Sequence, residues 1–347
     1  MQNCGNSGFM KKINRFEKFL IIRPDRLGDL VLSLPVAQGI KSKFPNSTIS
    51  YFISNSYSDI RYLAPYVDKW IIDKNNAGGR LSISQLTANI KISNFDWSIE
   101  LLPAWRTSIA AFFARIPNRI GTSRRIYSLF YNQKVSLRRR NSNIHQSDLD
   151  LTLLTPLNIL DSGLLPELKI TDNAIIKAKK LIGEMNNNFI IIHPGSGGSA
   201  PNWPLENYRK LSYMLTKKTE KRAIITGNNE NIGAFDECIN LNGKTDLETL
   251  AGLINLSSLF ISGSTGPLHL ADALGVKCMA FYPNRLNLDK FRWGPKRNLA
   301  NVLSPSSPCK CRDLSKCNCL NAITVEEAFE MAQKLMAIKP GKDVELS

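Results

Sequence analysis

The sequence predicts an α/β protein made of two doubly wound domains, each with a parallel sheet between layers of helices. The chain has 347 residues, enough for two domains of ordinary size. Short apolar segments alternate with helix-length segments, and this alternation begins again after a turn-rich seam near residues 165–175. Apolar residues make up 43% of the chain and charged residues 21%, which excludes a disordered protein, a collagen-like chain and a coiled coil.

Four strands are expected in the first half. Each is a short run of mainly apolar residues, as suits a strand that is buried on both faces of a parallel sheet. A polar loop at 24–29 leads from the first strand into a helix predicted over 30–44, and apolar spacing predicts a helical stretch at about 145–160. The expected strands lie at residues 19–23, 48–53, 70–73 and 97–101.

The second half repeats this plan, with helices predicted over 174–185, 204–216 and 325–338. Its expected strands lie at residues 189–193, 223–226, 259–262 and 278–281. We therefore divide the chain into a flexible N-terminus, two domains and a C-terminal segment whose helix is expected to pack back on the first domain. These parts span residues 1–17, 18–170, 171–324 and 325–347.

Basic residues are concentrated in one part of the chain. Lys and Arg number 45 against 29 Asp and Glu, a formal net charge of +16, and residues 101–147 contain nine Lys or Arg and no acid. Such a field favours an anionic partner, and nucleic acid, phospholipid headgroups and a phosphorylated substrate are candidates; the alternative is a solvated basic surface. No apolar stretch is long enough to span a bilayer and the N-terminus lacks a signal-like apolar run, so we expect a cytoplasmic protein.

Ligands of open α/β sheets bind beyond the carboxyl ends of the strands, so the loops at these ends are the candidate site. The loop at 195–200 fits G-x-G-x-x-A and can bind phosphate through backbone amides. The next strand does not end in the acid that binds the ribose of a dinucleotide cofactor. The sequence GKT at 243–245 is not part of a Walker loop, because the first glycine of that motif would have to stand at position 238, which is Cys238. A second anion-binding helix start follows at 264–267, with His269 one turn into the helix; the alternative is a capped helix with a core histidine.

Three motifs in order resemble glycosyltransferase family 9, the ADP-heptose:lipopolysaccharide heptosyltransferase family. They are RPDRLGDLV at 23–31, HPGSG followed by WPLENY between 193 and 208, and GSTGPLHLADALG at 263–275. The resemblance runs from about residue 18 to 338. It implies a GT-B-like fold, in which two Rossmann-like domains face each other across a cleft, with the acceptor on the first domain and the nucleotide-sugar on the second.

The resemblance also implies an inverting reaction without a metal or other cofactor, in which heptose passes from ADP-heptose to the lipopolysaccharide inner core. Asp29 occupies the position of the catalytic base, although Asp also suits an N-cap of the helix expected at Leu30. The expected acceptor-binding residues are Arg26, Arg106 and Arg119. The expected donor-binding residues are Ser196, Gly197, Asn202, Glu230, Ser264, Thr265, Gly266 and His269.

Two departures from the family pattern leave the donor open. Pro201 stands where the family has a phosphate-binding lysine, and Ser264 where it often has an Asp. A transferase for a different nucleotide-sugar or glycan acceptor is therefore one alternative, and an inactive homologue is another. A nucleic-acid-binding protein is the alternative of a different class, but the basic stretch has no recognisable nucleic-acid motif, so no nucleic-acid partner is expected.

Two further clusters have expected roles. Arg106 and Arg119 are expected to face the cleft. Arg138, Arg139 and Arg140 are expected to form a basic patch on the protein that faces the anionic cytoplasmic side of the inner membrane. The second cluster consists of four cysteines. Its C-x-C spacings are tighter than usual for structural zinc, so we interpret the cysteines as reduced thiols or an occasional disulfide, with a structural zinc site as the alternative. These cysteines are Cys309, Cys311, Cys317 and Cys319.

Overall fold

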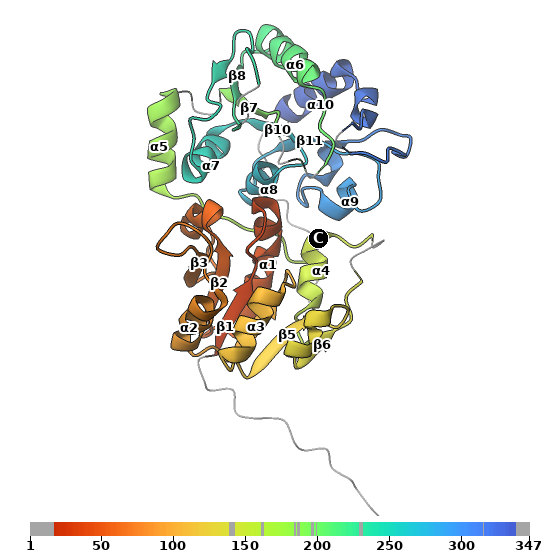
Figure 1. The fold of residues 1–347 in the computed structure, drawn as a ribbon. Coiled ribbons are helices and arrows are strands. Elements are labelled where there is room, and N and C mark those ends of the chain that lie inside the picture. Colours follow the sequence, from red (N-terminus) through yellow and green to blue (C-terminus); the bar gives the residue numbers. More distant parts are fainter. Residues whose placement is uncertain are drawn as a thin grey trace, which may run out of the picture.

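The computed structural model describes residues 17–138, 143–160, 163–183, 185, 188–195, 198, 200–228, 232–314 and 316–337. Within these residues the chain forms two stacked α/β units, each around its own six-stranded parallel sheet (Figure 1). The fold class predicted from the sequence is confirmed. No helix within the described ranges is both long and apolar enough to cross a membrane.

The first sheet has the strand order β3-β2-β1-β4-β5-β6, so β1 lies at its centre. Phe19 of β1 is in register with Ile49 of β2 on one side and Trp97 of β4 on the other. The strands are β1 (Lys18–Ile22), β2 (Thr48–Ser54), β3 (Lys69–Asp73), β4 (Trp97–Glu100), β5 (Asn118–Thr122) and β6 (Gln133–Val135). The helices are α1 (Leu27–Lys43), α2 (Ile83–Ser93), α3 (Trp105–Phe113) and α4 (Gln146–Thr152), with 3₁₀ helices η1 (Asn55–Tyr62), η2 (Ile126–Phe130) and η3 (Thr155–Leu157).

The second sheet has the matching order β12-β11-β10-β7-β8-β9, with β7 and β10 at its centre. Every residue of these two strands is buried, which explains their nearly unbroken apolar sequences. The strands are β7 (Phe189–His193), β8 (Arg222–Ile225), β9 (Ile239–Asn240), β10 (Leu259–Gly263), β11 (Cys278–Phe281) and β12 (Val302–Leu303). The helices are α5 (Asp172–Ile182), α6 (Leu205–Lys218), α7 (Leu247–Leu256), α8 (Gly266–Ala273), α9 (Lys290–Trp293) and α10 (Val325–Ala337), with η4 (Leu299–Asn301) and η5 (Cys319–Ala322).

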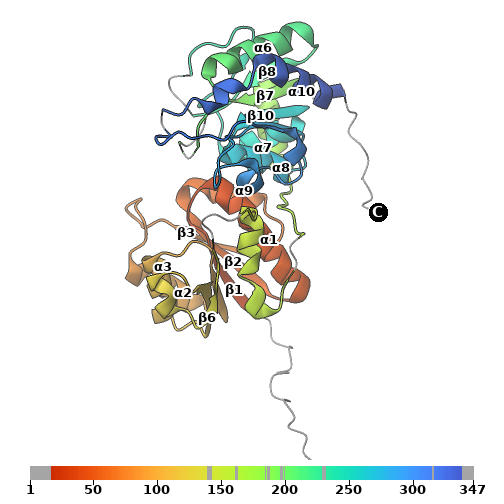
Figure 2. The same cartoon turned by 90° about the vertical axis from the view of Figure 1, so that its right-hand side faces the viewer.

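The C-terminal helix corrects one expectation. It does not pack back on the first unit; α10 lies against α6 in the second unit (Figures 1 and 2). Its apolar stripe, which includes Phe329 and Leu335, joins the same buried cluster as Leu211 and Leu215 of α6. Burying this apolar stripe against α6 stabilises the helix.

The two units touch where the N-termini of α1 and α8 meet end to end (Figure 1). Gly28 and Gly266 leave no room for a side chain at this contact. A Cβ on Gly266 would lie 2.8 Å from Leu27 Cβ and 3.1 Å from Gly28 N, and a Cβ on Gly28 would lie 2.9 Å from His269 Cδ2. Backbone therefore approaches backbone here, and the first turns of both helices border one pocket.

A second contact joins the start of α4 in the first unit to α9 and the segment that follows it in the second. The ring Nε2 of His145 lies 2.9 Å from Gly294 O, and Arg292 Nη2 donates to Gln146 Oε1 at 2.6 Å. Lys296 Nζ also pairs with Asp148 Oδ1 at 2.5 Å. These polar links and the α1–α8 contact hold the two units on either side of the pocket.

Candidate active site

A pocket of about 1270 Å³ lies between the two units, at the carboxyl edges of both sheets. This is where open α/β sheets bind their ligands, and the volume is sufficient for a nucleotide-sugar. The first unit contributes Arg26, Leu27, Gly28, Asp29, Ser56, Tyr57 and Asp59. The second contributes His193, Gly195, Ala200, Gly227, Asn228, Thr245, Asp246, Leu247, Leu250, Ser264, Thr265, Gly266, Pro267, His269, Asn287, Leu288 and Trp293.

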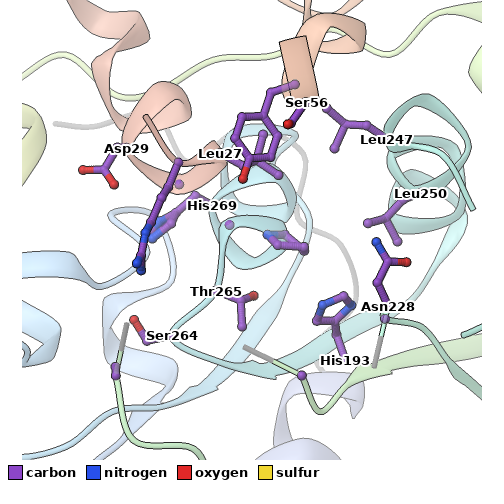
Figure 3. A pocket seen from close by; sticks show the side chains of 18 of the residues that line it. Leu27, Asp29, Ser56, His193, Asn228, Leu247, Leu250, Ser264, Thr265 and His269 are labelled. Carbon is purple, nitrogen blue, oxygen red and sulfur yellow. The ribbon is translucent and has the colours of Figure 1, made fainter. Parts of the chain in front are cut away.

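The side chains divide the pocket into two sides. In Figure 3 Asp29 and Ser264 lie on one side, and His193 and Asn228 on the other, with Thr265 between them. The carboxylate of the first unit thus lies on the same side as Ser264 of the second unit and across the pocket from His193 and Asn228. A donor bound to the second unit would lie beside this carboxylate.

Asp29 lies in the first turn of α1, which begins at Leu27 with Arg26 as its N-cap. The interpretation of Asp29 as the N-cap is therefore wrong. Its Oδ1 accepts a 2.6 Å hydrogen bond from Arg23 Nη2, and its side chain is 19% exposed. This hydrogen bond from Arg23 holds the carboxylate of Asp29 in one orientation at the pocket.

Arg23 organises three carboxylates from a fully buried position at the end of β1. Its Nη1 donates to Leu101 O at 3.1 Å, and its Nε lies 3.0 Å from Asp25 Oδ1. Asp150 of α4 is a third acid nearby, with Oδ2 3.7 Å from Nη1. Burial raises the pKa of the Asp25 carboxyl to about 7 against the lowering effect of Arg23, and the charge of Asp29 also raises it.

The start of α8 forms the wall of the pocket on the second unit. Thr265 is the N-cap, and its hydroxyl accepts from Leu268 N at 3.4 Å. The free backbone N–H groups of this first turn and the helix dipole attract an anion. Ser264, Thr265 and Gly266 all line the pocket, as the sequence predicts.

Two buried histidines lie beside this helix start. Burial lowers the pKa of His269 to about 3, with a smaller contribution from His145, and burial lowers the pKa of His193 to about 4. Both rings are therefore neutral at pH 7 and can each donate one N–H. The Nδ1 atom of His193 lies 3.0 Å from Thr226 Oγ1, whereas Nδ1 of His269 is buried with no hydrogen-bond partner among the residues that the structure describes.

Asn202 has a different place from the one predicted. It does not line the pocket; its Nδ2 donates to Pro194 O, and its Oδ1 packs where a Cβ on Gly263 would stand. Asn202 therefore stabilises the loop after β7 through its hydrogen bond to Pro194 O. Three other predicted donor-binding residues, Ser196, Gly197 and Glu230, lie outside the described residues.

The predicted acceptor-binding arginines are also separated. Arg26 lines the pocket, but Arg106 and Arg119 do not, so the expectation that both face the cleft is wrong. Arg106 forms a two-pronged pair with Asp73 and donates to Leu81 O at 2.7 Å. Arg119 donates to Phe130 O at 2.7 Å and to Ile116 O. Both guanidinium groups satisfy internal acceptors, which fixes them away from the pocket.

The pocket residues of η1 were not predicted from the sequence. Ser56, Tyr57 and Asp59 line the pocket because they follow β2, the neighbour of β1, at the same edge of the sheet. Trp293 was also missed. Its Nε1 donates to Asn287 O at 2.8 Å, and its O accepts from Tyr282 Oη at 2.8 Å, so it closes the pocket on the β11 side.

The charges of the pocket are unusual for an anion site. Among its described lining residues Arg26 is the single Lys or Arg, whereas Asp29, Asp59 and Asp246 are acidic. Backbone amides and dipoles at the starts of α1, α7 and α8 are therefore the main features of this pocket that attract an anion.

Two doubly wound units that hold a carboxylate beside an anion-binding helix start, in a nucleotide-sized pocket, are the arrangement of a two-domain glycosyltransferase. The sequence model of glycosyltransferase family 9 (heptosyltransferase) matches residues 83–320, and the chain belongs to this family. The resemblance stated from the motifs is thereby confirmed.

Similar proteins agree with this assignment. The chain is 26% identical over 298 residues to a Haemophilus influenzae protein named "Putative glycosyltransferase", covering 80% of this chain and 86% of that protein. It is 26% identical over 284 residues to lipooligosaccharide heptosyltransferase 2 of Haemophilus ducreyi, covering 74% and 80% of the two chains. The solved structure of E. coli ADP-heptose lps heptosyltransferase II superposes with a TM-score of 0.74 at 18% identity, covering 92% of this chain and 98% of that one.

Proposed function

We propose that this glycosyltransferase moves a heptose from ADP-heptose to the inner core of lipopolysaccharide, with inversion and without a metal ion in the reaction. The observation that carries the proposal is the position of Asp29, held by Arg23 in the pocket that the start of α8 also borders. The heptosyltransferase names of the relatives support the sugar and the acceptor.

In the proposed reaction an acceptor hydroxyl attacks the anomeric carbon as its proton passes to Oδ2 of Asp29. The bond from this carbon to the diphosphate oxygen breaks on the opposite face, which inverts the configuration, and ADP leaves. Negative charge grows on the departing phosphate. Thr265, the N–H groups at the start of α8 and Arg26 are the groups that stabilise this charge.

One observation favours a different nucleotide-sugar as the second candidate. Pro201 stands where the family has a lysine, and Arg26 is the single basic side chain among the described residues of the pocket. A donor held more by its base and sugar than by its diphosphate fits this charge pattern. The acceptor could then be another glycan.

Binding measurements separate the two candidates. Isothermal titration with ADP-heptose, ADP, UDP and GDP should show a preference for the adenine nucleotides, and Thr265→Ala should weaken ADP binding about 5- to 100-fold through the lost hydroxyl. Thr171→Ala is the matched control, since Thr171 caps α5 in the same way away from the pocket. A preference for UDP or GDP that Pro201→Lys shifts toward ADP would refute the heptose assignment and leave the glycosyltransferase.

We further propose that the protein works at the anionic cytoplasmic face of the inner membrane, where a lipid-anchored acceptor would be found. At the contact between α3 and η2, the side chains of Phe113, Ile126 and Leu129 are 62%, 79% and 77% exposed. Arg124 and Arg125 are exposed at the start of η2. Apolar side chains among basic ones are the composition of a membrane-binding surface. The membrane-binding patch was expected at Arg138, Arg139 and Arg140, and the last two of these lie outside the described residues.

Vesicle co-sedimentation tests this surface. Arg124→Gln combined with Arg125→Gln should lower binding to anionic vesicles about 10- to 30-fold at low salt, since each charge near the surface contributes roughly 1 kcal/mol. Turnover on a delipidated acceptor should not change. Lys179→Gln with Lys180→Gln removes two exposed charges from α5 of the other unit and should have little effect. Equal losses in both double variants would show that the attraction is general and that no docking surface exists at α3 and η2.

A further inference from the structure

Four cysteines of the second unit come together in the loop that leads from β12 to α10. The Sγ atoms of Cys309, Cys311 and Cys317 all lie within 4.8 Å of one another, and those of Cys309 and Cys317 are 3.4 Å apart. The thiol of Cys319 is within hydrogen-bonding reach of Cys309 and Cys317. All four are partly buried, and none lines the active-site pocket.

We propose that these four thiolates bind one tetrahedral metal ion, zinc or iron. A tetrahedron of four sulfur atoms at bonds of about 2.3 Å has edges of about 3.8 Å. The sulfur separations lie around this value, so small side-chain rotations would bring the atoms to it. A disulfide needs a sulfur separation of about 2.05 Å, shorter than the 3.4 Å between Cys309 and Cys317. An all-sulfur tetrahedral set selects zinc or iron over magnesium, calcium or manganese.

Charge around the loop supports the same conclusion. Four thiolates with a divalent ion carry a net charge of −2, which is costly to hold in a partly buried loop without cations nearby. Lys310, Arg312 and Lys316 alternate with the cysteines, and Asp313 is the single acid between residues 309 and 319. The sequence interpretation of these residues as free thiols considered the spacing alone, whereas the structure shows that both C-x-C pairs converge on one point.

The loop is fastened to the segment that closes the active-site pocket. Cys309 N donates to Asn284 O at 2.7 Å, and Arg285 donates to Cys311 O. The Nδ2 of Asn284 also donates to Pro305 O at 3.1 Å. Residues 287 and 288 follow directly and line the pocket, so the ion is structural and fixes this wall without touching the substrate.

Metal content of the full chain tests the proposal. The protein is purified without a histidine tag from cells supplied with both metals, and zinc and iron are measured by plasma mass spectrometry. We expect about one equivalent of zinc and iron combined, and the ratio of the two identifies the native metal. The double variant Cys309→Ser/Cys317→Ser should lose this metal, whereas Cys238→Ser, a change of the same kind elsewhere in the second unit, should keep it.

A second measurement covers a variant that fails to fold. Wild-type protein, stripped of metal with a chelator and kept reduced, should take up one equivalent of cobalt(II) and develop intense thiolate-to-cobalt charge-transfer absorption. Less than 0.1 equivalent of any metal in the wild type together with no cobalt spectrum would overturn the proposal. A disulfide between these cysteines, found by mass mapping of protein purified under argon, would also overturn it. Neither outcome depends on the identity of the sugar donor.

Discussion

The role of Asp29 as the base is tested by Asp29→Asn, which keeps the size and shape of the side chain but cannot take a proton. The amide oxygen can still accept from Arg23 Nη2, and the guanidinium keeps its contacts with Leu101 O, Asp25 and Asp150. A charge-assisted hydrogen bond becomes a neutral one at a 19% exposed side chain, so the loss of folding stability should be only about 1 kcal/mol, a few degrees in Tm. Loss of a positioned general base should lower kcat about 10²- to 10⁴-fold.

The assay measures single-turnover rates with saturating donor and acceptor, beside donor affinity by titration. Donor affinity should change little, because the start of α8 is unaltered. Asp96→Asn is the matched control: Asp96 Oδ2 accepts from Lys18 N at 3.0 Å at the opposite edge of the same sheet. If Asp29→Asn retains turnover within a few-fold of the wild type while Asp96→Asn behaves the same, then Asp29 is not the base.

Two further predictions concern the packing and the buried charges. Gly266→Ala should lower stability by about 1–3 kcal/mol and weaken donor binding, because its Cβ meets Leu27 Cβ at 2.8 Å; thermal unfolding should show no such loss for Gly79→Ala, where the contacts are ordinary. Burial raises the pKa of Glu100 from 4.5 to about 7, although hydrogen bonds from Thr107 and Ser108 act in the opposite direction. The folded state therefore favours the protonated carboxyl. This contribution to stability is complete below about pH 4.5 and is lost as the pH rises through about 7. Urea unfolding of Glu100→Gln should therefore lack a pH-dependent loss on the order of 3 kcal/mol between pH 5 and 8, and an unchanged pH profile would show that Glu100 is ionised throughout.

The strands that the sequence predicted share one property, a short apolar run, which is buried in all of them except the edge strand β3, where it is half-buried. The strands it missed lack this run. β5 reads NRIGT and β6 reads QKV, and β9 and β12 have two residues each at the two edges of the second sheet. Such strands form because the neighbouring strands supply hydrogen-bond partners for their backbone groups. These neighbours are distant along the chain, so the local sequence does not reveal the strands.

The candidate site was predictable where a short motif and a strand end coincide, as at Asp29 and Thr265. It was not predictable where a long side chain had a choice of partners. Arg106 and Arg119 carry the charge that an acceptor site needs, but Asp73 and Phe130 O engage them, and these partners are 33 and 11 residues away along the chain. Sequence shows the charge of a guanidinium group and does not show which acceptor it will meet.

The contact between Gly28 and Gly266 also determines how the two units can move. Neither glycine has a side chain that could change rotamer and keep the two helix ends in contact as they separate. A small displacement therefore ends the approach of backbone to backbone, whereas the links of Lys296 to Asp148 and Arg292 to Gln146 involve long side chains that can follow a larger one. Opening of the pocket should therefore separate Asp29 from the start of α8 before the polar links between the units break.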